Sequence, residues 1–468
     1  MLRSRLLTLT LAVTSLPALA QVNYRHTATD AAVGTVDIVA ADFNRDGLPD
    51  LAFFQEDGLH VVLNGGGATF SPDKITVLGF GAESLLAVDV NGDQWPDLVM
   101  GSVVLINNHD GTFRQGATLS GAVPVSHAIA GDLNGDGKVD LVLPSDDTHL
   151  QVFMGDGKGG FVAGQNLALS QPRIYADLLD INSDGKLDLM VVEASKVVLW
   201  PGLGNGTFGV PSFIRNPTND SVQHPIVNAV AADINNDGFP DIVLALLQPG
   251  TTSSSPGVNH VFIYRNDGRA HFTRINSFFS GNTSPDKLFS PATLSAGDLN
   301  GDGNIDLLFA SDSPDHTKTV YVLGNGNGTF GADHSFFPAN QVVIRDFTLD
   351  GRNDVATRDL GSSQSLDMYV ATNGSVNCAP PSSAHLAANI CMPSAASAAS
   401  PLLIRGSGNS PLGVKRVEIW IDGKKAAQKL DNQIGKRFTL APGTHRIAVV
   451  AVDKYLGTAT TAKNVTVH

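Results

Sequence analysis

The sequence predicts an all-β protein, built as a ring of seven repeated units followed by a small β-sandwich. Two observations support this fold class. A nine-residue pattern close to D-x-N-x-D-G-x-x-D begins at Asp42 and recurs six more times, at intervals of 43 to 65 residues. Apolar runs of about four to eight residues between Gly, Asn and Asp clusters are typical of strands, and no long helical periodicity occurs. A repeat period near 45 residues indicates one supersecondary unit per repeat.

The chain begins with a segment typical of a secretory signal. Positive charge at Arg3 and Arg5 precedes the mostly apolar residues 6–16, and Ala18-Leu-Ala20 is a small-residue cleavage pattern. The apolar stretch is shorter than the ~20 residues needed to span a membrane. We therefore interpret residues 1–20 as a signal peptide, and expect a mature protein that is secreted, periplasmic or on the cell surface, without an anchor or membrane insertion.

Each repeat has the same internal order. An apolar strand, such as Val36–Ala41, leads into the aspartate-rich loop, and a second strand leaves it. A third strand follows, as at Val197–Trp200, and a Gly-rich turn ending in Phe208 precedes the fourth. Four antiparallel strands at this period form one blade of a β-propeller.

The two ends of the repeat region indicate how the ring closes. The seventh repeat has a third strand near Met368–Val370 and then runs into residues 372–377 without a fourth strand. Residues 22–27 precede the first strand without a blade of their own. We expect this N-terminal segment to supply the missing outer strand, which would hide two sheet edges. The predicted seven-bladed β-propeller spans residues 21–376.

The aspartate-rich loops have the chemistry of calcium sites. Ca²⁺ prefers six to eight oxygen ligands, and a tight loop delivers them from alternate positions. In the first loop Asp42, Asn44, Asp46 and Asp50 would bind the ion, and glycine at the sixth position permits the sharp turn. Without metal, three carboxylates at ~4 Å repel by about 1 kcal/mol per pair even in water. An EF-hand is excluded, because Phe53 stands where that motif needs Glu.

The predicted calcium ligands are the first, third, fifth and ninth residues of every loop. They are Asp42, Asn44, Asp46, Asp50, Asp89, Asn91, Asp93, Asp97, Asp132, Asn134, Asp136, Asp140, Asp180, Asn182, Asp184, Asp188, Asp233, Asn235, Asp237, Asp241, Asp298, Asn300, Asp302, Asp306, Asp346, Thr348, Asp350 and Asp354. Up to seven Ca²⁺ ions are expected. The second loop, with Gln94 in place of glycine, and the seventh, with Thr348 in place of Asn, are the weakest candidates. A metal-free Asp/Asn turn is the alternative for any single copy.

The loop and the following G-x-G-x-F turn together resemble the FG-GAP/VCBS repeat of integrin α-chain propellers and of many secreted bacterial proteins. The resemblance covers about residues 22–375. It implies a seven-bladed β-propeller with calcium in the hairpin between the first and second strands of each blade. In that family the calcium hairpins share one face, which places the more variable segments on the opposite face.

The remaining residues predict a linker and a second domain. Cys378 and Cys391 are the only cysteines, and an oxidising compartment favours a disulfide between them within the linker 377–398. Residues 399–468 contain short alternating strands about ten residues apart, typical of a small β-sandwich, and resemble a bacterial Ig-like module. This domain is basic, which allows either a solvated face or attachment to an acidic polymer. Its basic residues include Lys415, Arg416, Lys424, Lys425, Lys429, Lys436 and Arg437.

The formal net charge of −14 does not require a basic partner. Three aspartates in each of seven loops account for 21 of the 45 acidic residues. The chain without Arg3 and Arg5 carries −16, and seven bound Ca²⁺ ions would bring this to about −2. No basic stripe occurs, so the sequence excludes nucleic acid as a partner.

No H-E-x-x-H, G-x-S-x-G or phosphate-loop pattern occurs, and no catalytic residue is predicted. Functional residues tend to lie on irregular loops. Here those loops bring eight candidates to the rim opposite the calcium hairpins: Asp146, His149, Arg173, Tyr175, His224, Asp315, His316 and Lys318. The leading hypothesis is a secreted, calcium-binding, non-catalytic adhesion protein, monomeric, that recognises an extracellular carbohydrate or protein. The alternatives are an extracellular polysaccharide lyase or hydrolase using rim carboxylates, and a purely structural surface component.

Overall fold

The computed structural model describes residues 24–31 and 37–467 with short gaps. The gaps are 56, 68, 72–73, 79–83, 124–126, 219–224, 249–257, 281–290, 301, 303, 312–318, 337–340, 349–352, 359–364, 372–377, 379–380, 382–384, 393–396, 399–401, 431, 439 and 455–456. The predicted signal peptide lies outside the described residues. The described chain is all-β, and it contains no helix long and apolar enough to cross a membrane.

Seven four-stranded antiparallel sheets form within the described residues. The first four, each from first to fourth strand, are β2 (Ile38–Ala41), β3 (Asp50–Gln55), β4 (Gly58–Val62) and β5 (Lys74–Thr76); β6 (Leu85–Val88), β7 (Asp97–Met100), β8 (Val103–Asn107) and β9 (Phe113–Thr118); β10 (Ile129–Gly131), β11 (Asp140–Asp146), β12 (His149–Gly155) and β13 (Phe161–Ala168); and β14 (Arg173–Leu179), β15 (Asp188–Glu193), β16 (Lys196–Trp200) and β17 (Ser212–Arg215). The others are β18 (Ile226–Ala232), β19 (Asp241–Gln248), β20 (Val258–Asn266) and β21 (Phe272–Ser280); β22 (Pro291–Gly297), β23 (Asp306–Ser311), β24 (Thr319–Gly324) and β25 (Phe330–Phe336); and β26 (Gln341–Arg345), β27 (Asp354–Arg358), β28 (Ser365–Ala371) and β1 (Tyr24–Ala31).

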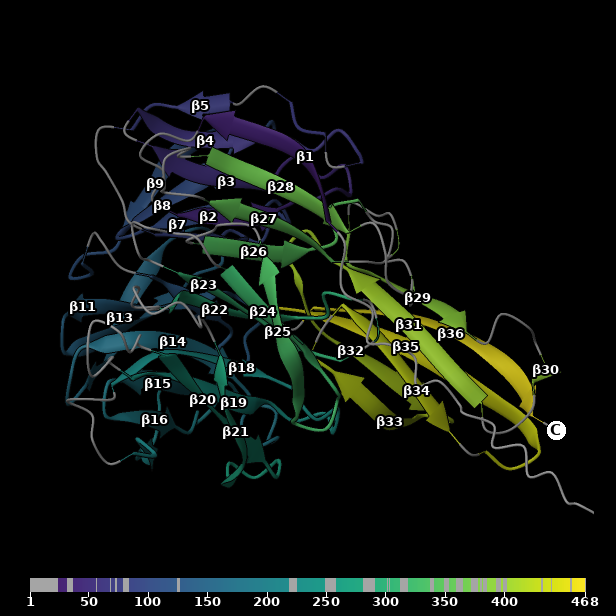
Figure 1. Cartoon of the computed structure of the whole chain (residues 1–468). Helices are drawn as coiled ribbons and strands as arrows, with labels where there is room; N and C mark the ends of the chain where they lie inside the picture. The colour runs from purple at the N-terminus through teal and green to yellow at the C-terminus, as the bar shows by residue number, and fades with distance from the viewer. Residues whose placement is uncertain are drawn as a thin grey trace, which may run out of the picture.

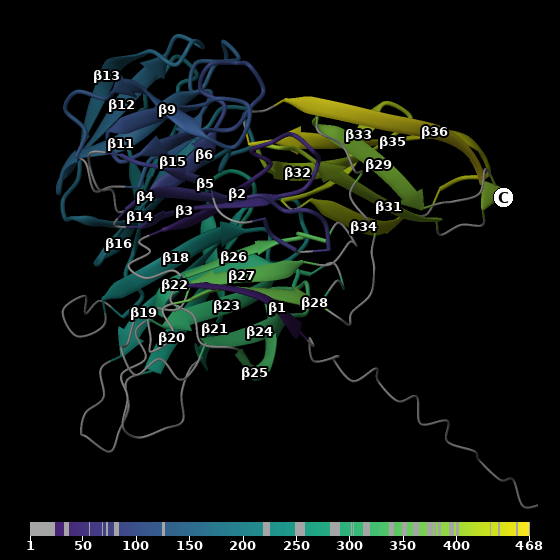
Figure 2. The same ribbon diagram turned by 90° about the horizontal axis from the view of Figure 1, so that it is seen from above.

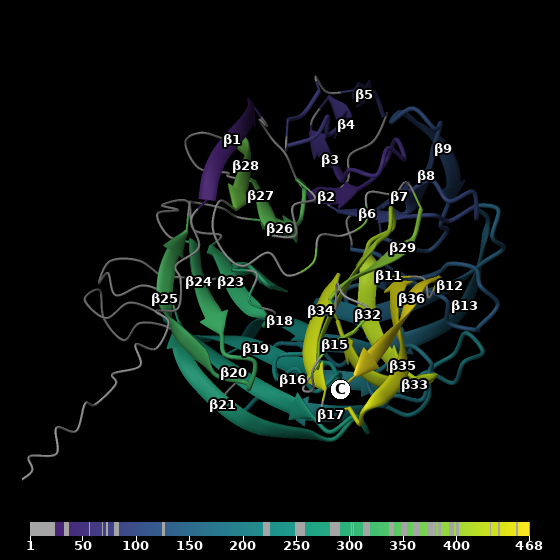
Figure 3. The ribbon, with the colours of Figure 1, turned by 90° about the vertical axis from the view of Figure 1, so that its right-hand side faces the viewer.

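The seven sheets are the blades of a β-propeller. Neighbouring first strands contact one another around the centre of the ring, and the contact between β26 and β2 joins the last blade to the first (Figure 3). Because consecutive strands are antiparallel, every loop between first and second strands lies on one face of the ring, and every turn between second and third strands lies on the other. The aspartate-rich loops therefore share one face.

The N-terminal strand completes the seventh blade, as the sequence predicted. β1 pairs antiparallel with β28, from Tyr24 opposite Ala371 to Ala31 opposite Ser365. The Tyr24 ring packs edge-on against Phe336 of the sixth blade, with ring centroids 5.1 Å apart. This pairing gives β28 a partner on its outer side and joins the two ends of the repeat region (Figure 1).

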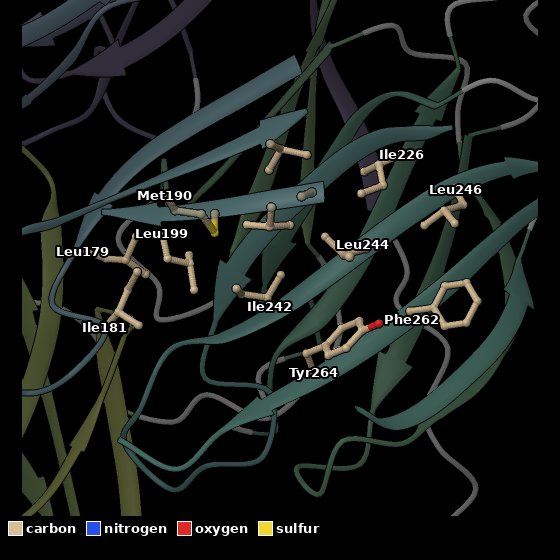
Figure 4. Close-up of a cluster of buried hydrophobic side chains, with 13 residues drawn as sticks. Leu179, Ile181, Met190, Leu199, Ile226, Ile242, Leu244, Leu246, Phe262 and Tyr264 are labelled. Atoms are coloured by element: carbon tan, nitrogen blue, oxygen red, sulfur yellow. The ribbon is translucent and has the colours of Figure 1, made fainter. Parts of the chain in front are cut away.

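Apolar side chains fill the spaces between blades. Between the fourth and fifth blades, Met190 and Leu199 pack with Ile242, Leu244 and other buried residues (Figure 4). Burying one such side chain stabilises the fold by about 1.5–3 kcal/mol. Because both faces of a blade meet a neighbour, the second and third strands are apolar at nearly every position instead of alternating.

Side-chain hydrogen bonds also connect successive blades. An Asn at the end of a third strand donates to the carbonyl of the second loop residue in the preceding blade. Asn64 donates to Phe347 at 2.8 Å, Asn107 to Phe43 at 2.9 Å and Asn266 to Ile181 at 2.8 Å. These bonds fix three of the loops, the seventh, the first and the fourth, against the following blade.

The C-terminal residues form a two-sheet β-sandwich. One sheet contains β29 (Ala387–Met392), β31 (Leu402–Asn409) and β34 (Gln433–Phe438); the other contains β30 (Ser397–Ala398), β36 (Thr458–Val467), β35 (Gly443–Asp453), β32 (Val414–Ile421) and β33 (Lys424–Lys429). A shared core including Ile404, Ile419 and Val449 lies between them. The predicted disulfide between Cys378 and Cys391 is confirmed, with an S–S distance of 1.99 Å. β29 lies within the segment expected to be a linker, and it pairs with β31.

The sandwich lies against the loop face of the propeller (Figures 1 and 2). The amide of Asp42 donates to the carbonyl of Pro411 at 3.5 Å. The guanidinium of Arg345 donates to Ala40 in the first blade at 3.0 Å and to Ser410 in the sandwich at 3.1 Å. The C-terminal domain therefore covers part of the face that carries the predicted metal loops.

Candidate metal loops and the central channel

The first loop is already folded around its predicted ligands. The carboxylate of Asp42 accepts hydrogen bonds from the amides of Asp46 at 3.0 Å and Gly47 at 2.9 Å. The side-chain oxygen of Asn44 accepts from the Asp46 amide at 2.9 Å, and its amide group donates to the Asp46 carboxylate at 2.9 Å. These bonds turn the first, third and fifth side chains toward the inside of one tight turn.

Four other loops repeat this geometry. In each, the fifth-position amide donates both to the first-position carboxylate and to the third-position Asn. The donors are Asp136, Asp184, Asp237 and Asp302, at 2.8–3.1 Å. The repeated pattern in the sequence therefore corresponds to a repeated backbone conformation.

The ninth-position aspartate has a role that the sequence did not reveal. In the first loop, one oxygen of Asp50 accepts from the amide of Phe43 at 2.8 Å, and the other accepts from Asn64 at 2.8 Å. The same two bonds, from the amide of the second loop residue and from an amide at the end of the third strand, occur in every blade. The other six residues are Asp97, Asp140, Asp188, Asp241, Asp306 and Asp354. Each of these buried carboxylates therefore joins its loop to the third strand of the same blade, and we call it the ninth-position clamp.

The loops concentrate negative charge in buried positions. Burial, with the nearby charges of Asp42 and Asp46, raises the pKa of Asp50 to about 8 despite its two amide donors. Burial likewise raises the pKa of Asp42 to about 6, Asp97 to about 7 and Asp241 to about 7. A divalent cation would favour the ionised form of these groups.

The loop residues fit calcium by the type of their donors. The described residues contain no group of three or more His, Cys, Asp and Glu side chains gathered as a metal centre. The loops instead combine carboxylates with an Asn oxygen and backbone carbonyls, the hard oxygen donors that Ca²⁺ prefers. A bound ion would be held by the first, third and fifth side chains, with the ninth-position carboxylate behind them.

The second loop departs from the pattern. Gln94 adopts a left-handed φ of 70°, where a side chain is unfavourable. The imidazole of His109 lies 3.0 Å from the carboxylate of Asp93 and stacks on Trp95 with centroids 4.6 Å apart. Although burial alone would raise the pKa of Asp93, the bond from His109 contributes to lowering it. His109 thus occupies an oxygen that a metal would need.

In the seventh loop, the Thr348 hydroxyl donates to Asp346 at 3.4 Å, and Asp350 lies outside the described residues.

The predicted rim residues are only partly within the described chain. Asp146 and His149 form one cluster at the turn between β11 and β12, with Nδ1 of His149 2.9 Å from the carboxylate. This bond and those from Thr148 lower the pKa of Asp146 to about 2. Arg173 starts β14 on the same face, whereas Tyr175 lies further along that strand. His224, Asp315, His316 and Lys318 lie outside the described residues.

A ring of polar positions, one near the start of each first strand, was missed in the sequence. The residue five positions before each loop is polar in every repeat: Asp37, Ser84, His127, Tyr175, Asn228, Thr293 and Gln341. The buried Asp37 accepts from the Leu85 amide at 2.7 Å and from the Gln341 side chain, and His127 lies 4.0 Å away. This carboxylate thus connects the first, second and seventh blades. The constant offset from the loop was the signal that could have identified the ring.

The channel between the first strands is hollow, and the C-terminal domain borders it. A cavity of about 900 Å³ is lined by Ala130, Tyr175 and Asp177 of the propeller and by Lys415 and Lys454 of the sandwich. A second cavity of about 450 Å³ shares Lys454 and lies beside the first and seventh blades. The hydroxyl of Tyr175 donates to Asp177 at 3.2 Å. Charged groups of both domains therefore meet inside the molecule.

Comparison with known proteins agrees with the repeat architecture. Residues 42–100, 180–244 and 233–309 match a family described as the FG-GAP-like repeat. These matched segments are similar to FG-GAP-like repeats and cover less than half of the chain. A T-cell immunomodulatory protein homolog of Plasmodium yoelii yoelii is 29% identical over 163 residues, covering 32% of this chain and 22% of that relative. The chain therefore spans only about a fifth of the length of this relative.

Two solved structures are partly similar to this chain. An Agrocybe aegerita lectin, described as recognising non-reducing terminal N-acetylglucosamine, has a TM-score of 0.48 and 18% identity, over 70% of this chain and 83% of the lectin. BBS1N, in its complex with ARL6DN, has a TM-score of 0.49 and 12% identity, over 75% and 98% of the two chains. Neither likeness transfers a ligand to this chain.

Proposed function

We propose that this chain is a secreted, calcium-stabilised, non-catalytic binding protein that recognises an extracellular carbohydrate or protein through the propeller face opposite the metal loops. The observation that carries the proposal is the position of the C-terminal domain. It covers the loop face through contacts of Pro411 with Asp42 and of Ser410 with Arg345. The face formed by the second-to-third-strand turns is at the other end of the ring.

The disulfide supports an extracellular setting. Disulfides such as Cys378–Cys391 form and persist in oxidising compartments. The signal peptide proposed for residues 1–20 would deliver the chain there. The C-terminal sandwich, which we propose to be Ig-like, would then serve as a fixed platform on the loop face.

The described rim residues favour binding over catalysis. A general acid needs a pKa near the working pH. The pKa of Asp146 lies at about 2 because His149 and Thr148 donate to its carboxylate, so this group is a poor proton donor at neutral pH. The Asp146–His149 pair can instead accept and donate hydrogen bonds to a sugar or a peptide.

Calcium would act on stability in this proposal. The ion would bind the first-, third- and fifth-position oxygens of each loop and favour the ionised forms of Asp42 and Asp50, whose pKa values are raised chiefly by burial and also by neighbouring carboxylates. Metal that binds only the folded ring stabilises it by about 2.7 kcal/mol per site at a concentration of 100 Kd. Elemental analysis of protein dialysed against calcium should find several ions per chain. Fewer than one ion per chain would reject the calcium assignment.

A glycan array probed with calcium-loaded protein tests the binding function. Specific binding that weakens in His149→Ala and Asp146→Ala is expected, because these residues lie on the free face. A matched variant, His271→Ala, changes an exposed histidine that pairs with Asp267 in the hairpin between β20 and β21, and should bind normally. Absence of any glycan or protein ligand would favour a purely structural role. Turnover of polyuronides lost in Asp146→Ala would favour the lyase or hydrolase alternative.

A further inference from the structure

The larger cavity lies between the two domains and contains two lysines that lack a partner. Lys415 is the second residue of β32 and Lys454 follows β35, and both residues line the space of about 900 Å³. Neither ammonium group makes a hydrogen bond or ion pair within the described part of the chain. Arg416 and Lys425, the other basic residues in the wall, are paired with Glu418 at 2.8 and 3.4 Å. The two lysines are therefore the cations available to a ligand.

The carboxylates around these lysines do not fully balance their positive charge. Asp177 is the nearest carboxylate that influences both lysines, and it also accepts from Tyr175 and from the Leu178 amide. Asp180 and Asp237 border the cavity, but their oxygens accept amide hydrogen bonds inside the fourth and fifth loops. The charge of Asp180 also acts on Lys415. Outside the loops and the ion pairs, the two ammonium groups face the single carboxylate of Asp177, a difference of one positive charge.

We propose that this cavity binds a small monoanionic carboxylate that bears hydroxyl groups, the chemistry of a uronic-acid residue. One carboxylate would balance the excess charge of Lys415 and Lys454, whereas a dianion such as phosphate would exceed it. Asp177 and the Tyr175 hydroxyl would accept and donate hydrogen bonds to the ligand's hydroxyl groups. Ile129, Leu178 and Phe239 supply apolar wall for the faces of a sugar ring. This site is separate from the binding face proposed above and does not depend on it.

The size and electrostatics of the cavity suit such a ligand. Ligand pockets commonly measure about 300–1,000 Å³ and combine apolar walls with a few convergent polar groups. Burial lowers the pKa of Lys415 to about 8 although the charge of Asp177 opposes the shift. Burial also lowers the pKa of Lys454. An anion placed between these groups would favour their charged forms and so gain affinity.

The test is isothermal titration calorimetry of the full mature chain in calcium buffer, with D-galacturonate, D-galactose and inorganic phosphate as probes. Galacturonate should bind at least tenfold more tightly than either other probe. Lys415→Met and Lys454→Met should each weaken galacturonate binding at least tenfold. The matched control Lys424→Met, an exposed lysine of β33 on the same domain, should leave it unchanged.

A variant that binds galacturonate more tightly separates loss of a ligand contact from misfolding, because a misfolded protein would not gain affinity. Asp177→Asn removes the competing carboxylate and keeps the side-chain volume, so galacturonate should bind several-fold more tightly. Equal binding of galactose and galacturonate, tighter binding of phosphate, no binding at millimolar probe, or weaker binding in Asp177→Asn would each overturn the proposal.

Discussion

The first and fifth loops differ from the third and fourth in how their carboxylates are accommodated. The first and fifth lie beneath the C-terminal domain, where Asp42 and Gly238 contact Pro411 and Gln428. Burial raises the pKa of Asp233 in the fifth loop to about 6, as it does for Asp42. The third and fourth loops are open to solvent and carry a lysine at the seventh position. Lys138 lies 3.0 Å from Asp136, and Lys186 lies 3.7 Å from Asp184.

This difference shows that one sequence motif serves two environments. In the open loops a solvated ammonium group offsets the fifth-position carboxylate, and such exposed pairs contribute only ~0–1 kcal/mol. In the covered loops no lysine occupies the seventh position, which is Leu48 or Phe239. A bound cation would therefore contribute most to the covered loops. The largest expected consequence of metal removal is loosening of the C-terminal domain from the first and fifth blades.

Calcium removal should have the largest effect. Each ion that binds only the folded state contributes about 2.7 kcal/mol at 100 Kd, and 1 kcal/mol shifts Tm by about 2–4 °C for a domain of 150–250 residues. Chelation with EDTA should lower Tm by at least about 10 °C in differential scanning calorimetry, and magnesium should not restore it. Hydrogen exchange should rise first in residues 410–416 and in the first loop. An unchanged Tm would refute the metal assignment for both classes of loop.

Removal of a ninth-position aspartate should have the second-largest effect on stability. Asp241→Ala leaves the buried amides of Ile234 and Asn266 without their acceptor, and each unsatisfied donor costs about 1–3 kcal/mol. The expected loss is about 2–5 kcal/mol in metal-free protein, measured by urea unfolding. Asp237→Ala, at the exposed fifth position of the same loop, should cost less than about 1 kcal/mol without metal but should weaken calcium binding. Equal losses of stability in the two variants would mean that the hydrogen bonds of the ninth residue do not stabilise the blade.

The contact between the domains gives a third test. Arg345→Met removes charged hydrogen bonds to Ala40 and Ser410, each contributing about 1.5–3 kcal/mol. Stability should fall by about 2–4 kcal/mol, and limited proteolysis should release the C-terminal domain sooner. The control Arg269→Met changes an exposed arginine of the β20–β21 hairpin. Unchanged proteolysis of Arg345→Met would show that the covered loops do not depend on this contact.

The smallest effect is expected in the open loops. Lys138→Met removes the ammonium group beside Asp136, so metal-free stability should change by less than about 1 kcal/mol. The calcium-induced rise in Tm should increase slightly, because a competing cation has been removed. The wild-type protein measured at the same calcium concentrations is the reference. A smaller rise in the variant would contradict the view that Lys138 competes with the metal.

The repeat ring was predictable because its signals are local and repeated. The loop beginning at Asp42 fixes a turn within nine residues, and seven copies at similar spacing determine the number of blades. The N-terminal strand was predictable by counting, because the seventh repeat ends without a fourth strand. The disulfide followed from the presence of only two cysteines in a chain with a predicted export signal.

The contacts between distant residues could not be predicted in the same way. The two hydrogen bonds of Asp50 reach Asn64, and nothing in the loop pattern distinguishes such a clamp from a metal ligand. The basic residues of the C-terminal domain were expected on a solvated or polymer-binding face. Lys415 instead lines an internal cavity, together with Lys454, for which no prediction was made. Their position depends on how two domains dock, which has no periodic signature in the sequence.

Pairing of β1 with β28 has a consequence for how the chain folds. Tyr24 and Ala371 lie at opposite ends of the propeller sequence, so the ring closes through contacts of very high sequence separation. Such contacts form slowly, because the entropy of closing the loop must be overcome before they stabilise the chain. During synthesis β1 thus emerges long before β28, its partner. Until the two strands pair, the open edge of β28 can pair with another chain, and the ring is most prone to aggregate just before it is complete.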